Sequence, residues 1–115
     1  MQYRRFGKTD WQVSEISMGG SWFSGRPEYG LLPVSHGVAM VERAFELGIN
    51  YFDTASRYGA GQSEINLGRV LKELSADVYV GTKYSLGEAD PSDLKGGVVA
   101  SVDASLKRLG RESVD

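Results

Sequence analysis

Residues 49–83, INYFDTASRYGAGQSEINLGRVLKELSADVYVGTK, predict a strand, a helix and a second strand. Residues 49–55 are rich in aromatic and β-branched side chains, which is typical of a strand. From about Ser63, apolar residues recur at the spacing of one buried helix face: Leu67, Val70, Leu71 and Leu74. Residues 77–83 are again strand-like. Two strands joined by a helix of this length predict a βαβ unit with parallel strands.

The residues before this unit predict further strands and a loop. Residues 3–6 and 11–13 are short runs of alternating polarity around Gly7-Lys8-Thr9-Asp10, and they predict a β-hairpin. Residues 15–20 predict a short strand that ends in glycines. Residues 21–34 show neither a helical nor a strand period, and loops of this length in a compact domain are often functional.

Two further helices are expected, one on each side of the central unit. The first has Ser35 as its N-cap and ends at Gly48. Its apolar side comprises Val38, Val41 and Phe45, with Met40, Ala44 and Leu47 beside them. The second starts at Asp90-Pro91, with aspartate as the N-cap and proline in the first helical position.

Glycines weaken the start of this last helix. Gly96 and Gly97 each cost about 1 kcal/mol relative to alanine, so its firm part is expected from near Val98 to Gly110. Its buried side is expected to contain Val99, Val102, Leu106 and Leu109. A short segment, residues 112–115, follows.

The complete order is a hairpin followed by three strand-helix pairs, which predicts an α/β fold with a parallel sheet in a single domain, residues 1–115. This order suits either a doubly wound sheet or a barrel. Since a barrel of eight such units takes about 250 residues, the residues form either a small three-layer domain or part of a barrel.

The composition argues against several classes of partner. The formal net charge is -2 and there is no run of like charges, which argues against nucleic acid or a membrane surface as the main partner. With no cysteine and a single histidine, a metal site is not expected. The polar N-terminus does not resemble a secretory signal, and a cytoplasmic protein is expected.

Three ionisable side chains are expected to meet at one edge of the sheet. Asp53 and Lys83 each end a predicted strand, and Tyr58 follows Asp53 by five residues. An ammonium group close to a tyrosine hydroxyl favours the phenolate, and a carboxylate beside the ammonium keeps it charged. Such a tyrosine can protonate a carbonyl oxygen. Taken singly, however, an aspartate in this place is more often a turn residue, a tyrosine a packing residue and a lysine a solvated one.

Four segments resemble the aldo-keto reductase family in order and spacing: residues 48–59, residues 61–68, Gly81-Thr82-Lys83 and residues 104–110. The resemblance implies the N-terminal part of a (β/α)8 barrel preceded by a hairpin. It also implies reduction of aldehydes or ketones, or oxidation of sugars or alcohols in reverse, with NADP(H) or NAD(H).

The resemblance also assigns roles to individual residues. Tyr58 would be the general acid, Lys83 the group that lowers its pKa, and Asp53 the partner of Lys83. Gly20-Ser21-Trp22 resembles the place where the family's backbone and an aromatic side chain approach cofactor and substrate, with Asp53 nearby. A glycine turn with a packing tryptophan is an equally good interpretation of that step.

The family's fourth catalytic residue is a histidine at the end of the next strand, which would begin at Val114-Asp115. His36 lies at the start of a helix and does not receive this role. The 115 residues alone are therefore expected to be inactive. Alternatives are a non-catalytic fragment, which could self-associate through exposed barrel edges, and a reductase-like binding subunit.

Overall fold

The computed structural model describes residues 1–24, 34–86 and 91–115, which form two sheets and a layer of helices. The antiparallel sheet is a hairpin of β1 (Tyr3–Arg5) and β2 (Gln12–Ser14). The parallel sheet has the order β3 (Met18–Gly19), β4 (Tyr51–Asp53) and β5 (Tyr79–Gly81). The α-helices are α1 (Val34–Glu46), α2 (Gln62–Glu73) and α3 (Leu94–Leu109), and the 3-10 helices are η1 (Ser21–Ser24) and η3 (Pro91–Asp93).

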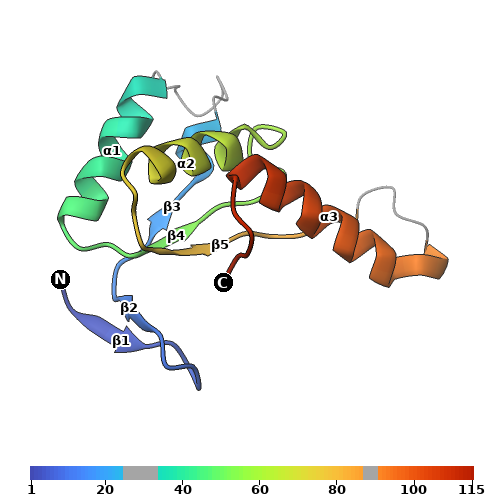
Figure 1. Cartoon of the computed structure of the whole chain (residues 1–115), viewed down its shortest axis with the longest axis horizontal. Helices are drawn as coiled ribbons and strands as arrows, with labels where there is room; N and C mark the ends of the chain where they lie inside the picture. The colour runs from blue at the N-terminus through green and yellow to red at the C-terminus, as the bar shows by residue number, and fades with distance from the viewer. Residues whose placement is uncertain (25–33, 87–90) are drawn as a thin grey trace.

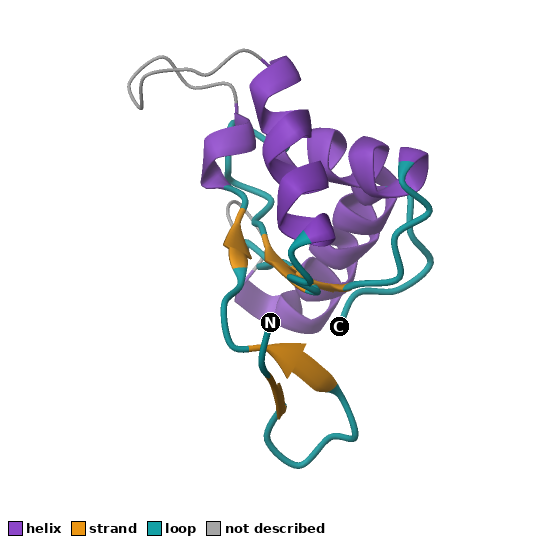
Figure 2. Ribbon diagram, turned by 90° about the vertical axis from the view of Figure 1, so that its left-hand side faces the viewer, coloured by secondary structure: helices purple, strands orange, loops and turns teal. Residues whose placement is uncertain are grey.

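The helices lie side by side in chain order along the parallel strands, while the hairpin projects away from the helices (Figures 1 and 2). The strands follow one another in chain order and all run parallel. This confirms the predicted βαβ units. Consecutive parallel strands with their helices on one side are typical of a barrel wall.

The core lies between the strands and the helices. Phe52 of β4 and Val80 of β5 are fully buried, and they pack in one cluster with Val41, Leu67 and Leu109 from the helices. Because side chains alternate along a strand, Asp53 belongs to the face of β4 opposite Phe52, away from the helices. The functional candidates and the core therefore occupy opposite faces of the sheet.

A stack of aromatic rings attaches the hairpin to the amino ends of the parallel strands. Phe6 stacks on Trp11 at 6.1 Å and on Tyr51 at 5.9 Å, and Trp11 stacks on Tyr79 at 5.1 Å. Such ring pairs contribute about 0.5–1.5 kcal/mol each beyond their buried area. The hairpin thus covers the end of the sheet opposite the carboxyl ends of the strands.

The amino-terminal end of α3 differs from the prediction. The α-helix begins at Leu94, later than the predicted start at Asp90-Pro91, and Gly96 and Gly97 lie inside it, so the regular helix also begins before the firm part that was expected from near Val98. The Asp93 carboxylate accepts the N–H of Gly96 at 2.9 Å, an N-cap that contributes about 1 kcal/mol and offsets the cost of one glycine. The predicted cap, Asp90, lies outside the described residues.

Three residues of the predicted apolar faces are exposed: Phe45, Leu47 and Val99. Phe45 lies about 100° around α1 from the buried Ala44, because a helix has 3.6 residues per turn, and it points away from the core. Val99 belongs to the amino-terminal half of α3 and is 51% exposed, and one end of α3 extends past α2 (Figure 1). The buried residues of α3 are Ser105 and Leu109.

Smaller differences concern the boundaries of the first helix and the loop before it. Helix α1 begins at Val34, so Ser35 lies in its first turn and is not the N-cap; helix ends assigned from sequence commonly differ by one or two residues. The predicted loop starts with a 3-10 turn, η1, and its residues 25–33 lie outside the described part.

After α3 the chain returns to the sheet beside β5. The N–H of Asp115 donates to the carbonyl oxygen of Val80 at 3.1 Å, and the N–H of Val80 donates to the Asp115 carboxylate at 2.9 Å. The neighbouring residue Tyr79 bonds to β4, so Val80 faces the opposite edge. Asp115 therefore lies where the sequence predicts the start of the next strand.

The contact between α2 and α3 depends on Gly68, and it generates a stability prediction. A Cβ atom on Gly68 would lie 2.2 Å from the Leu109 carbonyl oxygen, which is backbone and cannot easily move. We expect Gly68→Ala to lower the free energy of unfolding by about 1–3 kcal/mol, although alanine favours helix by about 1 kcal/mol. Urea denaturation followed by circular dichroism measures this. Lys72→Ala on the exposed side of α2 is the control, and a Gly68→Ala variant as stable as the parent would contradict the close contact.

Candidate active site

The carboxyl ends of the three parallel strands lie at one edge of the sheet. The register pairs Gly19 with Asp53, and Asp53 with Gly81. Each strand then continues into a loop that begins at this edge, so the loops carrying Gly20, Tyr58 and Lys83 are neighbours. The register alone thus brings together the segments that the sequence identified.

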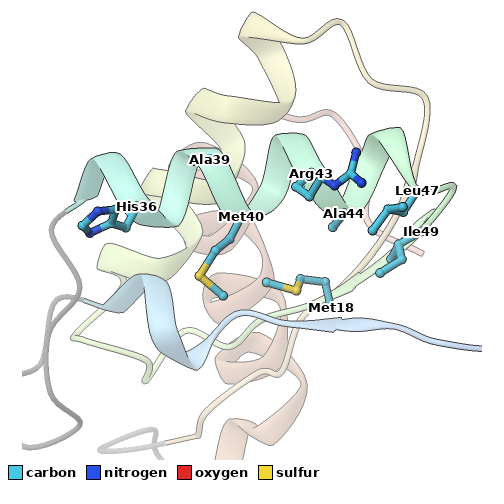
Figure 3. A pocket seen from close by; sticks show the side chains of 8 residues that line it. All are labelled: Met18, His36, Ala39, Met40, Arg43, Ala44, Leu47 and Ile49. Atoms are coloured by element: carbon cyan, nitrogen blue, oxygen red, sulfur yellow. The ribbon is translucent and has the colours of Figure 1, made fainter.

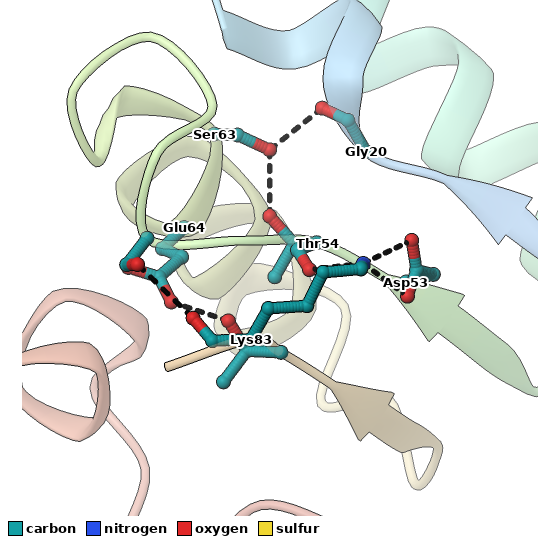
Figure 4. A network of polar contacts seen from close by, with 8 residues as sticks. Gly20, Asp53, Thr54, Ser63, Glu64 and Lys83 are labelled. Atoms are coloured by element: carbon teal, nitrogen blue, oxygen red, sulfur yellow. Dashed lines mark hydrogen bonds and ion pairs between the residues drawn. The ribbon is translucent and has the colours of Figure 1, made fainter. Parts of the chain in front are cut away.

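Lys83 and Asp53 form an ion pair at this edge (Figure 4). The Lys83 ammonium donates to both carboxylate oxygens of Asp53, each at 2.7 Å, and to the Thr54 carbonyl oxygen at 2.9 Å. An ammonium group has three protons, and three acceptors surround it here. This arrangement fixes the direction of an otherwise flexible side chain.

The pKa of Lys83 is raised above its ordinary value by its neighbours. Burial is the largest single influence and acts to lower this pKa, but the hydrogen bonds and negative charge of Asp53, with a contribution from Tyr58 in the same direction, outweigh it. Lys83 is therefore a cation throughout the neutral range.

Tyr58 lies against this cation. The Lys83 nitrogen is 5.2 Å from the centre of the Tyr58 ring, within the range of a cation–π contact. Tyr58 sits in a sharp turn whose following residues, Gly59, Ala60 and Gly61, all have positive φ. A Cβ atom on Gly59 would lie 2.1 Å from the Ser24 carbonyl oxygen, so only glycine permits this turn to pack against η1.

Gly20 is held at the same edge by the backbone and by a buried hydroxyl pair (Figure 4). Its N–H donates to the Asp53 carbonyl oxygen at 2.6 Å, and its own carbonyl oxygen accepts from the Ser63 hydroxyl at 2.6 Å. Since Ser63 has one hydroxyl proton, the Thr54 hydroxyl must donate in the 2.8 Å contact between Thr54 and Ser63. Thr54 and Ser63 are both fully buried.

The two residues after Gly20 are the half-buried Ser21 and the exposed Trp22. Trp22 is 53% exposed, while its neighbour Phe23 is buried in the core. Phe23 thus packs in the core, while the Trp22 ring has a large exposed surface. Gly20 thus lies beside Asp53, and Trp22, two residues further along the chain, has an exposed aromatic surface.

Sequence reasoning missed a second set of charged residues behind the edge. Glu64 is fully buried, and its carboxylate accepts hydrogen bonds from Thr82 and from Arg108, each at 2.6 Å. The sequence could have predicted the burial of Glu64, because Glu64 precedes Leu67 and Leu71 by three and seven residues and so lies on the predicted buried face of the helix. A charged residue on such a face requires a partner.

His36 lies away from these residues, on α1. It lines a groove of about 490 Å³ between α1 and β3 (Figure 3), together with apolar side chains such as Met18 and Met40. Strand β3 pairs with β4 on one side and, among the described residues, has no partner strand on its other side, so it is an edge strand of the parallel sheet. His36 accordingly belongs to neither set of polar residues described above.

The described residues contain neither a candidate metal site nor a candidate membrane-spanning helix. In residues 1–24, 34–86 and 91–115, no three or more histidine, cysteine, aspartate or glutamate side chains are grouped as metal ligands would be. None of the helices in these ranges is long and apolar enough to cross a membrane.

Comparison with known proteins identifies relatives of the whole chain. Residues 15–115 match the model of the Aldo/keto reductase family. All of the chain aligns, at 33% identity, with 36% of a probable voltage-gated potassium channel subunit beta from Oryza sativa subsp. japonica. It also aligns, at 35% identity, with 35% of the L-glyceraldehyde 3-phosphate reductase of Escherichia coli (strain K12).

A solved structure gives the same result for the fold. The chain superposes over its whole length on 38% of an aldo-keto reductase from Bacillus halodurans in its holo form, with a TM-score of 0.80 and 28% identity. The predicted fold, the N-terminal portion of a (β/α)8 barrel, is thereby confirmed. The chain spans little more than a third of the length of these relatives.

The ion pair generates a prediction about Asp53→Asn. Asp53 makes the largest upward contributions to the pKa of Lys83, and the substitution removes its charge, so we expect this pKa to be lower in Asp53→Asn than in the parent chain. The ¹³C shift of Lys83 Cε followed against pH measures this. Asp103→Asn, on the exposed side of α3, is the control.

The same shift predicts how stability depends on pH. Because folding raises the pKa of Lys83, the pair stabilises the native chain fully below pH 10.5, and this contribution disappears as the pH rises through the folded-state pKa. The stability difference between the parent and Asp53→Asn should therefore be largest near neutral pH. If the pKa of Lys83 were the same in Asp53→Asn as in the parent chain, the Asp53 charge would not be what raises it, and this pH dependence of stability would not be expected.

Proposed function

Because the chain belongs to the aldo/keto reductase family, we propose that it carries the proton-donating part of the active site of a carbonyl reductase. The observation that carries this proposal is the Lys83 ammonium, held by Asp53 at 2.7 Å and lying 5.2 Å from the Tyr58 ring. The fold permits many activities, so this local geometry, rather than the barrel, supports the assignment.

Each of the three side chains has a defined task in this proposal. Tyr58 donates its hydroxyl proton to the carbonyl oxygen of the substrate, a step to which a positioned acid contributes about 10²–10⁴-fold. Lys83 stabilises the negative charge that remains on the phenolate oxygen, and Asp53 keeps Lys83 in place. In the reverse direction the phenolate accepts the proton of an alcohol.

A nicotinamide cofactor, NADP(H) or NAD(H), supplies or accepts the hydride. The loop after β3 fits such a group because Trp22 in this loop has an exposed ring and the Gly20 N–H fixes the start of the loop to Asp53. Ser21, Trp22 and Asp53 would line the nicotinamide half, with Gly20 keeping the backbone close. A Cβ atom on Gly20 would lie 2.8 Å from the Asp53 carbonyl oxygen, so a larger residue would displace this turn.

We propose a small aldehyde, ketone or sugar as the substrate. This agrees with the compounds that two relatives are named for, the L-glyceraldehyde 3-phosphate reductase of E. coli and the L-galactose dehydrogenase of Arabidopsis thaliana. Three expectations from the sequence stay predictions. They are a cytoplasmic location, self-association through exposed barrel edges, and the inactivity of the 115 residues on their own.

A second candidate function is that of a binding subunit. The similarity to potassium channel beta subunits favours it, since these reach 33–35% identity over nearly the whole chain. The ion pair of Asp53 and Lys83 beside Tyr58 favours the reductase, because a surface used only for binding does not require a cation directed at a phenol. A test of proton donation distinguishes the two.

This test places the chain in a complete barrel. In a chimera, residues 1–115 replace the aligned part of the E. coli L-glyceraldehyde 3-phosphate reductase, which is 35% of that protein. We expect the chimera to consume nicotinamide cofactor with L-glyceraldehyde 3-phosphate. Tyr58→Phe should lower kcat by about 100-fold or more, because the acid is lost, and leave the cofactor Kd nearly unchanged.

The matched control is Tyr79→Phe, which removes a phenol hydroxyl at the amino end of β5 and keeps the ring that stacks on Trp11. Its activity should equal that of the unaltered chimera. A Tyr58→Phe chimera within a few-fold of the parent would show that another group donates the proton. A folded chimera that binds cofactor but reduces no substrate would favour the binding subunit.

A further inference from the structure

Glu64 is a buried carboxylate with two different partners. It lies in the first turn of α2 with no exposed surface. Its Oε1 accepts from the Thr82 hydroxyl at 2.6 Å, and its Oε2 accepts from Arg108 Nε at 2.6 Å. Figure 4 shows Glu64 together with Lys83 and Asp53. Burying a charge is costly unless it is paired and hydrogen-bonded, so both contacts have to be made for Glu64 to remain in place.

We propose that Glu64 is a positioning residue for Lys83. By holding the Thr82 hydroxyl, it sets the course of the backbone after β5 so that the Lys83 ammonium reaches Asp53. The inference rests on the proposed function for the use of that ammonium, but the link from Glu64 to Lys83 can be measured without turnover.

The geometry after β5 supports this link. The pairing of β4 and β5 continues to Gly81, whose carbonyl oxygen accepts from the Thr54 N–H at 2.8 Å. Thr82 and Lys83 then point to opposite faces, as consecutive residues of an extended chain do. Thr82 bonds to Glu64 on the helix side, and Lys83 bonds to Asp53 on the other side. A rotation of the backbone here would break both bonds together.

The Lys83 backbone has its own contact, which limits where it can move. The Ser56 hydroxyl donates to the Lys83 carbonyl oxygen at 3.0 Å. Thr82 and Lys83 are therefore held on two sides, by Glu64 from α2 and by Ser56 from the loop after β4. Thr82 is the residue directly before Lys83, so its hydrogen bond to Glu64 orients the backbone from which the Lys83 side chain extends.

Arg108 keeps Glu64 in the position that Thr82 requires. Its side chain also donates to the Ser105 hydroxyl at 3.1 Å and passes close to Gly61, where a Cβ atom would lie 2.6 Å from it. A simpler interpretation is that the ion pair only joins α2 to α3. That interpretation needs Oε2 and Arg108 but gives no role to the bond between Oε1 and Thr82.

The test therefore changes Thr82 and leaves the ion pair intact. Thr82→Val keeps the shape and every charge but removes the hydroxyl, and Thr82→Ser keeps the hydroxyl. The readout is the rate at which acetic anhydride acylates Lys83 in the whole chain at mildly alkaline pH, measured by mass spectrometry relative to the exposed Lys72. Asp53→Asn gives the rate of a released Lys83.

We expect Lys83 in the parent to react more slowly than Lys72, because Asp53 holds its proton. In Thr82→Val its rate should rise about threefold to tenfold towards the Asp53→Asn rate, since one pKa unit is a tenfold change in the free amine. Thr82→Ser should react like the parent. Circular dichroism confirms that each variant is folded.

Two results would overturn the inference: a folded Thr82→Val chain with the parent rate, or a Thr82→Ser chain as reactive as Thr82→Val. If Thr82→Val does not fold, the rate at which the Thr82 hydroxyl proton of the parent chain exchanges with water is measured instead. Slow exchange with water in its NMR spectrum supports the bond to Glu64, and rapid exchange excludes it. Neither readout depends on reductase activity, so failure here and failure of the Tyr58→Phe chimera are separate results.

Discussion

The parallel register of β3, β4 and β5 is the constraint on which the site depends. It sets Gly19, Asp53 and Gly81 side by side, so that the three loops that follow start at one edge. Side-chain alternation then separates the two faces: Phe52 and Val80 enter the core, while Asp53 stays accessible to Lys83. A shift of one residue in any strand would exchange these faces and place the carboxylate in the core.

The two ends of the sheet are stabilised by different physical interactions. At the amino ends, stacked rings of the hairpin and of Tyr51 and Tyr79 provide apolar contact. At the carboxyl ends, hydrogen bonds to buried polar groups such as Ser63 and Glu64 fix the loops. Apolar packing tolerates small displacements, whereas hydrogen bonds specify distance and direction. The end that carries the candidate site is therefore the one organised by polar contacts.

Local patterns in the sequence predicted the βαβ units and placed the three candidate residues at strand ends or in the loop that follows one. The choice of a barrel and the roles of these residues came from the family resemblance. Local patterns failed where the burial or pairing of a residue depends on a distant partner. The period of α2 and the strand ends at Asp53 and Lys83 are local signals. The partnership of Glu64 with Arg108 spans 44 positions, and no window of sequence contains it. Val99 had the right spacing for a buried face but is exposed, and one end of α3 extends past α2 (Figure 1). Gly96 and Gly97 suggested a weak helix start because the cap at Asp93 was not recognised.

The central claim is that Lys83 reaches both Asp53 and Tyr58 in the folded chain. A nuclear Overhauser experiment on the chain with labelled lysine and tyrosine tests it most directly. Since the Lys83 nitrogen lies 5.2 Å from the centre of the Tyr58 ring, cross-peaks are predicted between the Lys83 Hε protons and the Tyr58 ring protons. They should disappear in Asp53→Asn, where the ion pair is lost. A folded chain whose Lys83 Hε protons show no cross-peak to Tyr58 would contradict the account.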